Sequence, residues 1–173
     1  WMEERRENLW AASQARQGRT TVEIAAAADG TLLAMRARIA SDAGAYHAYP
    51  TTAALEPLGT ASILPGPYRV PAYEYDARAL ATHKPPLGAY RGVGMTMGAF
   101  VMERMLDLVA ERAGLDPAEV RRRNLLPREA YPFKSTTGLT YDSGDFPKAL
   151  EQALAAVGYE ELRRRQAERR AAG

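Results

Sequence analysis

The sequence contains no cysteine, and this absence excludes several kinds of protein. A chain without thiols cannot be a disulfide scaffold, bind zinc or an iron–sulfur cluster through thiolates, or use a cysteine nucleophile. Long apolar runs are also absent, since none approaches the roughly 20 residues that a transmembrane helix needs. The charged and polar first ten residues do not fit a signal peptide. The 173 residues, 46% hydrophobic and 25% charged, instead fit one ordinary soluble domain.

The chain also has almost no net charge, with a formal value of +2. The sequence has 23 lysines and arginines against 21 acidic residues, and residues 159–173 carry the whole excess with five arginines and three glutamates. Because residues 1–158 are balanced, they are a poor electrostatic match for a polyanion, and we expect no nucleic-acid partner. We interpret residues 159–173 as a solvated basic helix or tail rather than a nucleic-acid or lipid contact.

The strand signals are local and clear. Asp29-Gly30 separates residues 20–28 from residues 31–40, which predicts an antiparallel hairpin. In its second arm the apolar residues alternate with polar ones, so one face is predicted to be buried; that face comprises Leu33, Met35, Ala37 and Ile39. Residues 73–82 are a further strand candidate. Residues 41–71 are irregular, apart from a short helix over 51–62 that we expect to break at Pro57.

Helical signals dominate the second half of the chain. The longest helix is predicted over residues 96–113, with an apolar stripe and a stop at Gly114. The stripe consists of Met97, Val101, Met105, Leu108 and Val109. Asp116-Pro117 then begins a short helix that ends near Asn124. Residues 127–146 look like a loop, and helices are expected over 147–157 and from Tyr159 onward.

A further short polar helix is expected within residues 1–18, anchored by Leu9 and Trp10. Together these elements predict an α+β fold, an antiparallel hairpin and at least one further strand packed with C-terminal helices. The chain opens with Trp1-Met2, which is unusual for an intact translation product, so we expect it to be an internal fragment of a longer protein.

The strongest candidate for a ligand-binding segment is the glycine-rich turn of residues 88–98, which leads into the long helix. Glycine-rich turns at a helix start expose backbone N–H groups and the positive end of the helix dipole, which suits an anion or an oxo group. Arg91 would add a charge-assisted donor. The spacing is not the dinucleotide fingerprint, and an ordinary tight turn without a ligand remains an alternative interpretation.

Other chemistry-bearing residues form no recognisable constellation. His47 and His83 lack partners at metal-ligand spacing, which favours surface or packing roles. Ser62, Ser135 and Ser143 lack the context of an activated nucleophile. The methionines near residues 95–105 favour packing, and the basic run Arg121-Arg122-Arg123 suits a helix C-terminus. The residues alone therefore indicate no complete catalytic site and no metal site.

Several blocks of the chain closely resemble, in order, the molybdenum-binding large subunit of the xanthine dehydrogenase/aldehyde oxidase family, which includes carbon monoxide dehydrogenase large subunits. The matching blocks are ERRE (4–7), SDAGAY (41–46), LPGPY (64–68), PLGAYRGVG (86–94), MERMLD (102–107), GLDPAEVRRRNL (114–125) and TGLTYDSGD (137–145). The resemblance covers essentially the whole chain. It implies that residues 1–158 are a fragment of a molybdopterin-binding domain that forms one wall of an active site.

The resemblance also implies the chemistry. Members of this family hydroxylate a carbon centre with water as the oxygen source, at molybdenum held by molybdopterin. Electrons then pass to iron–sulfur and flavin domains or subunits, and we expect a cytoplasmic enzyme. Tyr90, Arg91 and Gly92 match the loop that approaches the cofactor, whereas Val93 and Glu56 match the substrate pocket.

Departures from the family pattern narrow this expectation. The segments that carry the catalytic glutamate and a cofactor-side glutamine are not matched, so the chain alone is expected to bind no cofactor and to be inactive. Gly92 stands where copper-dependent carbon monoxide dehydrogenases have cysteine, and Val93 where purine hydroxylases have an aromatic residue. Glu56 is followed by Pro57 rather than arginine, and Met95-Thr96-Met97 replaces Arg-Pro-Glu.

These departures favour an apolar aldehyde or an N-heteroaromatic substrate. The alternative is a non-catalytic packing or assembly domain that binds no cofactor. Exposed apolar residues are expected to face parts of the protein outside this chain, so the fragment is expected to self-associate.

Overall fold

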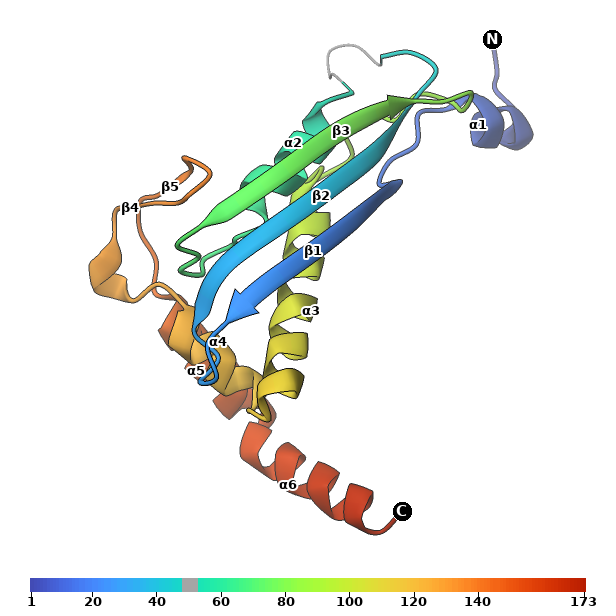
Figure 1. The fold of residues 1–173 in the computed structure, drawn as a ribbon. Coiled ribbons are helices and arrows are strands. Elements are labelled where there is room, and N and C mark those ends of the chain that lie inside the picture. Colours follow the sequence, from blue (N-terminus) through green and yellow to red (C-terminus); the bar gives the residue numbers. More distant parts are fainter. Residues whose placement is uncertain (48–52) are drawn as a thin grey trace.

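The computed structural model describes residues 1–47 and 53–173, and a three-stranded sheet forms its framework (Figure 1). The strands are β1 (Gly18–Ala26), β2 (Leu32–Gly44) and β3 (Tyr73–Ala81), in the order β1-β2-β3. β1 pairs with β2 in antiparallel fashion, and β3 lies parallel to β2. The predicted α+β class and hairpin are therefore confirmed.

The hairpin turn forms where Asp29-Gly30 predicted it. Gly30 has a φ of 83°, and the Asp29 carboxylate accepts a hydrogen bond of 3.0 Å from the Thr31 N–H. The prediction was wrong for Leu33, whose side chain is 51% exposed whereas Leu32 is only 2% exposed. The register shifts at Ala25/Ala26, so that Ala26 pairs with Leu32 and the alternation of faces is displaced at this end of β2.

β3 is parallel to β2 because a helix connects them. Helix α2 (Leu55–Ile63) lies between these strands in the sequence and packs against the sheet. Pro57 does not break α2, contrary to the prediction, because it is the third residue of the helix. The N–H groups of a first helical turn have no intrahelical acceptor, so a proline costs no hydrogen bond there. Positions 51 and 52 of the predicted helix lie outside the described residues.

Helix α3 (Met95–Ala113) packs its small and apolar residues against α2 and the sheet. It ends, as predicted, at Gly114, with a φ of 67°. The prediction of the buried stripe was wrong, because the residues predicted to form it are only partly buried. The fully buried residues lie in the adjacent row along the helix. The fully buried residues recur at every fourth position and are Gly98, Met102, Leu106 and Ala110. These residues complete the core with the inner face of β2, which consists of Met35, Ala37 and Ile39.

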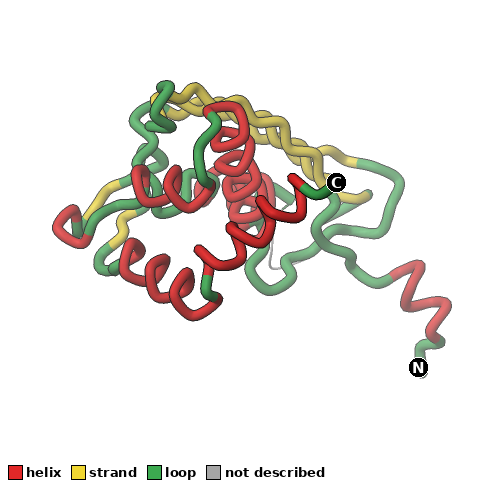
Figure 2. Tube along the Cα trace, turned by 90° about the horizontal axis from the view of Figure 1, so that it is seen from below, coloured by secondary structure: helices red, strands yellow, loops and turns green. Residues whose placement is uncertain are grey.

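The molecule has two layers, with the sheet on one side and the helices on the other (Figure 2). Helices α2 and α3 cover the face of the sheet that carries the buried residues of β2. The opposite face carries exposed charged residues from β2 and β3, including Arg36, Arg38, Glu74 and Asp76. This polar face explains why the side chains of β2 alternate between buried and exposed.

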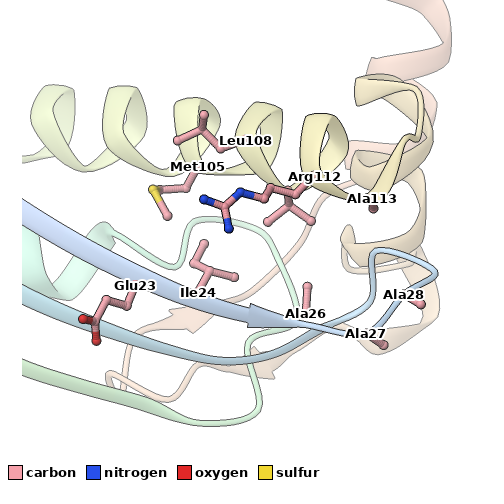
Figure 3. Close-up of a pocket in the computed structure, with 10 residues that line it drawn as sticks. Glu23, Ile24, Ala26, Ala27, Ala28, Met105, Leu108, Arg112 and Ala113 are labelled. Atoms are coloured by element: carbon pink, nitrogen blue, oxygen red, sulfur yellow. The ribbon is translucent and has the colours of Figure 1, made fainter.

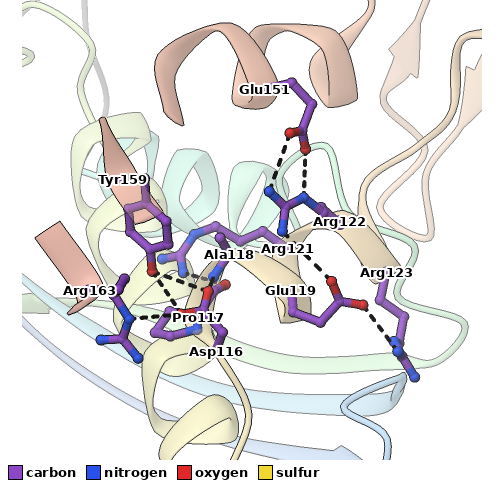
Figure 4. Close-up of polar contacts among 10 residues, drawn as sticks. All are labelled: Asp116, Pro117, Ala118, Glu119, Arg121, Arg122, Arg123, Glu151, Tyr159 and Arg163. Atoms are coloured by element: carbon purple, nitrogen blue, oxygen red, sulfur yellow. Dashed lines mark hydrogen bonds and ion pairs between the residues drawn. The ribbon is translucent and has the colours of Figure 1, made fainter. Parts of the chain in front are cut away.

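Helix α4 (Pro117–Asn124) is held by the polar contacts shown in Figure 4. Its N-cap residue, Asp116, accepts a hydrogen bond of 2.8 Å from the Ala118 N–H, as the sequence predicts. The basic run has specific partners. Arg121 contacts Glu103 and Asp107, Arg122 contacts Glu151, and Arg123 contacts Glu119 and Asp29. The run therefore joins α4 to its neighbours, in addition to suiting the helix C-terminus.

The C-terminal segments surround α4. The predicted loop 127–146 contains a 3-10 turn (Arg128–Ala130) and a small antiparallel pair, β4 (Phe133–Lys134) and β5 (Thr140–Tyr141). Helices α5 (Phe146–Val157) and α6 (Tyr159–Ala171) follow as predicted. The Tyr159 hydroxyl and the Arg163 guanidinium both reach Asp116, so the start of α6 is fastened to α4 (Figure 4).

The N-terminal helix, α1 (Arg5–Ala11), extends from the body (Figure 1). Leu9 and Trp10 are 66% and 67% exposed, so the prediction that they anchor this helix is wrong for this chain. Over residues 1–47 and 53–173, no helix has both the length and the apolar character needed to cross a membrane.

Candidate functional site

The candidate site lies where the starts of α2 and α3 touch. A Cβ atom on Gly94 would lie 2.2 Å from the Thr60 nitrogen and 2.3 Å from the Glu56 carbonyl oxygen. One turn later, a Cβ atom on Gly98 would lie 2.5 Å from Ile63. Only glycine permits so close an approach of two backbones. These glycines therefore place the turn that precedes α3 beside the first turn of α2.

The turn itself consists of residues 90–94. The Val93 N–H donates to the Tyr90 carbonyl at 2.7 Å, and the Met95 N–H donates to the Gly92 carbonyl at 2.8 Å. Gly92 has a φ of 85°, which suits glycine, but Val93 also has a positive φ, of 45°. A β-branched residue rarely adopts this conformation, and such strain persists only where the surroundings impose it. The side chains of Tyr90 and Arg91 are exposed at the surface of the turn.

Glu56 lies beside this turn in the first turn of α2. Its side chain is buried, and the residue is only 7% exposed. Oε2 accepts a hydrogen bond of 3.4 Å from the Arg16 N–H, whereas Oε1 has no hydrogen-bond partner among the described residues. Glu56 and Val93 line the same narrow pocket. Because a buried carboxylate oxygen without a donor is costly, this arrangement suits a ligand or water that supplies a donor.

Asp42 forms the far side of the same pocket. Its carboxylate contacts Lys84 at 2.8 Å, the Thr82 hydroxyl at 2.6 Å and the Gly44 N–H at 2.8 Å. The hydrogen bond from Lys84, followed by those from Thr82 and Gly44, lowers the pKa of Asp42 to about 2. These contacts fasten the end of β2 to the segment that leads toward Tyr90.

Arg16 is a residue of this site that the sequence did not indicate. Its guanidinium donates a hydrogen bond to the Arg91 carbonyl and lies 4.9 Å from the centroid of the Tyr90 ring. Arg16 lies 40 residues from Glu56 and 75 from Arg91 along the chain. Nothing in its polar neighbourhood suggests that it lies between them, so only the fold reveals it.

The other candidate residues lie elsewhere. The His47 ring accepts a hydrogen bond from the Ala53 N–H, and His83 is exposed. Ser62 donates to a carbonyl of its own helix, and Ser143 donates to Asp142. Among the described residues, no three histidine, aspartate or glutamate side chains form a cluster that could hold a metal ion.

A second, larger pocket lies between β1 and α3, away from Glu56 (Figure 3). Ile24 comes from the strand, and Met105, Leu108 and Val109 come from the helix. We call this pocket the β1–α3 groove. Its lining is mostly apolar, and it holds no pair of groups suited to acid–base chemistry, so we assign it no catalytic role.

Comparison with known proteins agrees with the geometry. Residues 1–125 match the molybdopterin cofactor-binding domain family. The whole chain is 40% identical to part of the nicotine 6-hydroxylase large subunit of Paenarthrobacter nicotinovorans, and it covers 21% of that protein. It is 36% identical over 99% of its length to the carbon monoxide dehydrogenase large chain of Hydrogenophaga pseudoflava, again covering 21% of that protein.

Solved structures show the same relationship. Quinoline 2-oxidoreductase from Pseudomonas putida 86 superposes with a TM-score of 0.93 at 39% identity, over 100% of this chain and 22% of that one. A Cu,Mo-CO dehydrogenase superposes with a TM-score of 0.86 at 34% identity, over 99% and 22% of the two chains. The chain thus spans about a fifth of the length of these relatives.

The residues present fit a molybdopterin cofactor. The strained glycine turn leads into the start of α3, Arg91 is exposed on it, and a buried oxygen of Glu56 beside it has no partner within residues 1–47 and 53–173. Residues 1–125 match the family model, and the chain superposes closely on a molybdenum enzyme. The chain belongs to the molybdopterin cofactor-binding domain family of molybdenum-containing oxidoreductases.

Proposed function

We propose that the chain forms one wall of the active site in a molybdenum hydroxylase large subunit. The protein that contains it would oxidise a carbon atom of an N-heteroaromatic substrate with water as the oxygen source; an aldehyde is the second candidate substrate. One observation carries the proposal: the Tyr90–Gly92 turn and the Glu56 oxygen that is unpaired in the described part of the chain lie on neighbouring helix starts held together by Gly94.

The turn would bind the cofactor. Tyr90, Arg91 and Gly92 stand at the exposed start of α3, where free backbone N–H groups and the helix dipole favour negative charge. The guanidinium of Arg91 would add forked donors for an anionic or oxo group. When bound, the molybdenum cofactor supplies the redox centre that accepts two electrons from the substrate carbon. The role of this chain is to orient the cofactor and to shape the space in front of it.

Glu56 and Val93 would contact the substrate. A carboxylate whose Oε1 has no partner among the described residues is able to accept a hydrogen bond from a ring N–H of a heteroaromatic compound. Val93 offers an apolar wall without an aromatic face. Two relatives are named for nicotine and quinoline, which are N-heteroaromatic compounds, and this favours that class. Gly92 cannot bind copper, which disfavours copper-dependent oxidation of carbon monoxide.

The complete protein would pass electrons to iron–sulfur and flavin domains or subunits, in the cytoplasm. Several relatives are named as a large subunit, a large chain or a subunit of a dehydrogenase complex, which supports an assembly of several parts. The isolated chain would bind no cofactor and would be inactive, because it spans about a fifth of such subunits.

The test is a substrate screen on the complete complex that contains this chain, with quinoline-type heterocycles, aldehydes, xanthine and carbon monoxide. The Glu56→Gln variant keeps the shape of the side chain but removes its charge. It should lower kcat/KM for the heterocycle by about tenfold, because a charge-assisted hydrogen bond becomes a neutral one, at unchanged molybdenum content. Glu74→Gln, on the exposed face of the sheet, is the matched control and should leave kcat/KM unchanged.

Three results would contradict the proposal. A complex that contains no molybdenum would favour a packing or assembly role instead. Turnover of carbon monoxide alone, or of the purine xanthine alone, would exclude quinoline-type heterocycles and aldehydes as the substrates. Molybdenum and turnover in the purified 173-residue chain would show that it is not merely one wall of the site.

A further inference from the structure

We infer that Arg16 is a positioning residue that holds the Tyr90–Gly92 turn against Glu56. Its effect on catalysis rests on the proposed function, whereas its effect on the turn is independent of that function. Arg16 is not itself among the residues that line the Glu56 pocket, so it would act through the residues that it contacts.

Two groups of Arg16, its backbone N–H and its guanidinium, contact three residues of the site. Its backbone N–H donates to Glu56 Oε2 at 3.4 Å. Its guanidinium donates to the Arg91 carbonyl, and the same group lies 4.9 Å from the centroid of the Tyr90 ring. Glu56 and Arg91 come from different helix starts, so Arg16 connects the two halves of the candidate site.

The backbone around Arg16 is fixed on both sides. The Gln14 N–H donates to the Pro86 carbonyl at 3.1 Å, and the Gly88 N–H donates to the Gln14 carbonyl at 2.8 Å. On the other side, the Asp42 N–H donates to the Gln17 carbonyl at 2.9 Å. The segment between α1 and β1 therefore runs beside residues 86–88, which lead into the turn, and this places Arg16 next to Tyr90.

Backbone strain marks the same place. Arg16 and Val93 are the non-glycine residues of the described chain with positive φ, at 64° and 45°. They lie on either side of Glu56, one bonded to its carboxylate and one lining its pocket. Non-glycine residues keep such conformations only where several contacts impose them, and these conformations cluster at functional sites. Arg16 and Val93 are both strained and both lie beside the Glu56 carboxylate, which indicates a functional site at this carboxylate.

Only arginine suits these contacts. A planar guanidinium is able to stack on an aromatic ring while its edge N–H groups donate to a carbonyl. A lysine ammonium would keep the charge but lose the planar stacking. Arg16→Lys is therefore not a conservative change at this position. It should weaken the contacts of Arg16 less than Arg16→Ala does, so the two variants form a graded series.

The experiment compares Arg16→Ala, Arg16→Lys and the control Arg19→Ala in the complete complex. Arg19 is an exposed arginine of β1, three residues away. Amide hydrogen exchange is followed in the peptide that covers residues 88–95. Arg16→Ala should speed exchange there by roughly tenfold, from the loss of one hydrogen bond and one cation–π contact, with a smaller increase in Arg16→Lys. Arg19→Ala should leave exchange unchanged.

Two further readouts connect the turn to function. Molybdenum content per large subunit should fall in Arg16→Ala, and kcat should fall more than KM changes, because the turn is mispositioned rather than removed. The variant Arg91→Ala tests the proposed function separately. If Arg91→Ala keeps full molybdenum content and turnover, the proposed function fails, while hydrogen exchange still decides the role of Arg16.

Unchanged exchange over residues 88–95 in Arg16→Ala would overturn the inference. If Arg16→Ala does not assemble, Arg16→Lys decides: exchange equal to that of the unmodified complex would overturn the inference, and faster exchange confined to this peptide would support it. Faster exchange throughout the subunit would show a general structural role and would also overturn it.

Discussion

At the residue scale, the candidate site depends on the absence of a side chain at Gly94. The nearest atoms to a Cβ at this position belong to the backbone of Glu56 and Thr60, at 2.2–2.3 Å, and backbone atoms cannot move aside cheaply. Gly94→Ala should therefore separate the starts of α2 and α3 and destabilise the chain by about 1–3 kcal/mol, as overpacking does. Urea denaturation measures this change.

Gly59 is a matched control for this substitution. It lies in α2 and faces the same contact, but a Cβ there would lie 3.6 Å from the Gly94 nitrogen, an ordinary contact distance. Because alanine is the better helix former, Gly59→Ala should be neutral or stabilising by up to about 1 kcal/mol. Equal destabilisation by both substitutions would refute the argument that the close approach is specific to Gly94.

Single residues could be predicted from the sequence where their role depends on near neighbours in the chain. The turn at Asp29-Gly30, the cap at Asp116 and the stop at Gly114 were all predicted, because each depends on residues within about four positions. The Tyr90–Gly92 turn was found because it is rich in glycine. Arg16 was not found, because its three contacts lie 40–75 residues away and an arginine in a polar segment resembles any exposed arginine.

At the scale of elements, Asn124 joins the hairpin to α4. Its side chain accepts from the Leu32 N–H at 2.9 Å and donates to the carbonyls of Gly30 and Val120 at 2.9 and 2.8 Å. The residue is only 2% exposed. Asn124→Ala would leave the hairpin groups buried without partners, which should lower the free energy of unfolding by about 2–4 kcal/mol.

Urea denaturation again provides the measurement, and Asn8→Ala provides the control. Asn8 makes its side-chain hydrogen bond to Glu3 at the exposed surface of α1. Its replacement should change the free energy of unfolding by less than about 0.5 kcal/mol. A value for Asn124→Ala within the same range would contradict a structural role of Asn124 at the hairpin.

A second connection between elements predicts a dependence on pH. Asp42 ties the end of β2 to Lys84 and Thr82, and these contacts lower the pKa of Asp42 from 3.8 to about 2. The ionised carboxylate therefore stabilises the folded chain fully above about pH 4, and the stabilisation is lost as the pH falls toward 2. Asp42→Asn should cost about 1–2 kcal/mol at pH 7, allowing for the partial exposure of Lys84.

The difference between Asp42→Asn and the unmodified chain should shrink as the pH is lowered from 4 to 2, in denaturation curves measured at each pH. Asp76→Asn is the control on the same sheet, because Asp76 pairs with Arg78 at the exposed face. Its effect on stability should be much smaller. A difference for Asp42→Asn that is constant across this pH range would show that the carboxylate charge is not what stabilises the junction.

At the scale of the whole molecule, the element types were predicted but their arrangement was only partly predicted. Hydrophobic alternation and helix signals predicted β1 to β3 and the helices, since both depend on short periods, whereas β4 and β5 lie in a segment that was predicted to be a loop. The parallel pairing of β2 with β3 depends on α2 crossing the sheet, and the buried row of α3 depends on the close contact with α2 at Gly98. The strand pairing and the buried row both arise when the layers pack together, so a local sequence pattern does not predict them. Glu56, in the same way, was identified by family resemblance rather than by its own neighbourhood.

The whole-molecule prediction concerns the β1–α3 groove. This surface is mostly apolar, with Glu23 and Arg112 in its lining, and the chain spans about a fifth of the length of its relatives, so we expect the isolated chain to bury the groove by self-association. Leu108→Glu places a charge in the groove and should shift the chain toward monomer in sedimentation velocity runs over a range of concentrations. Val157→Glu, on the exposed side of α5, is the control and should not change the distribution.

Self-association that persists in Leu108→Glu but disappears in Trp10→Ser would instead place the contact between copies at α1, where Leu9 and Trp10 are exposed. A wild-type chain that stays monomeric at every concentration would contradict the prediction, because an uncovered groove would then be compatible with a stable, separate domain.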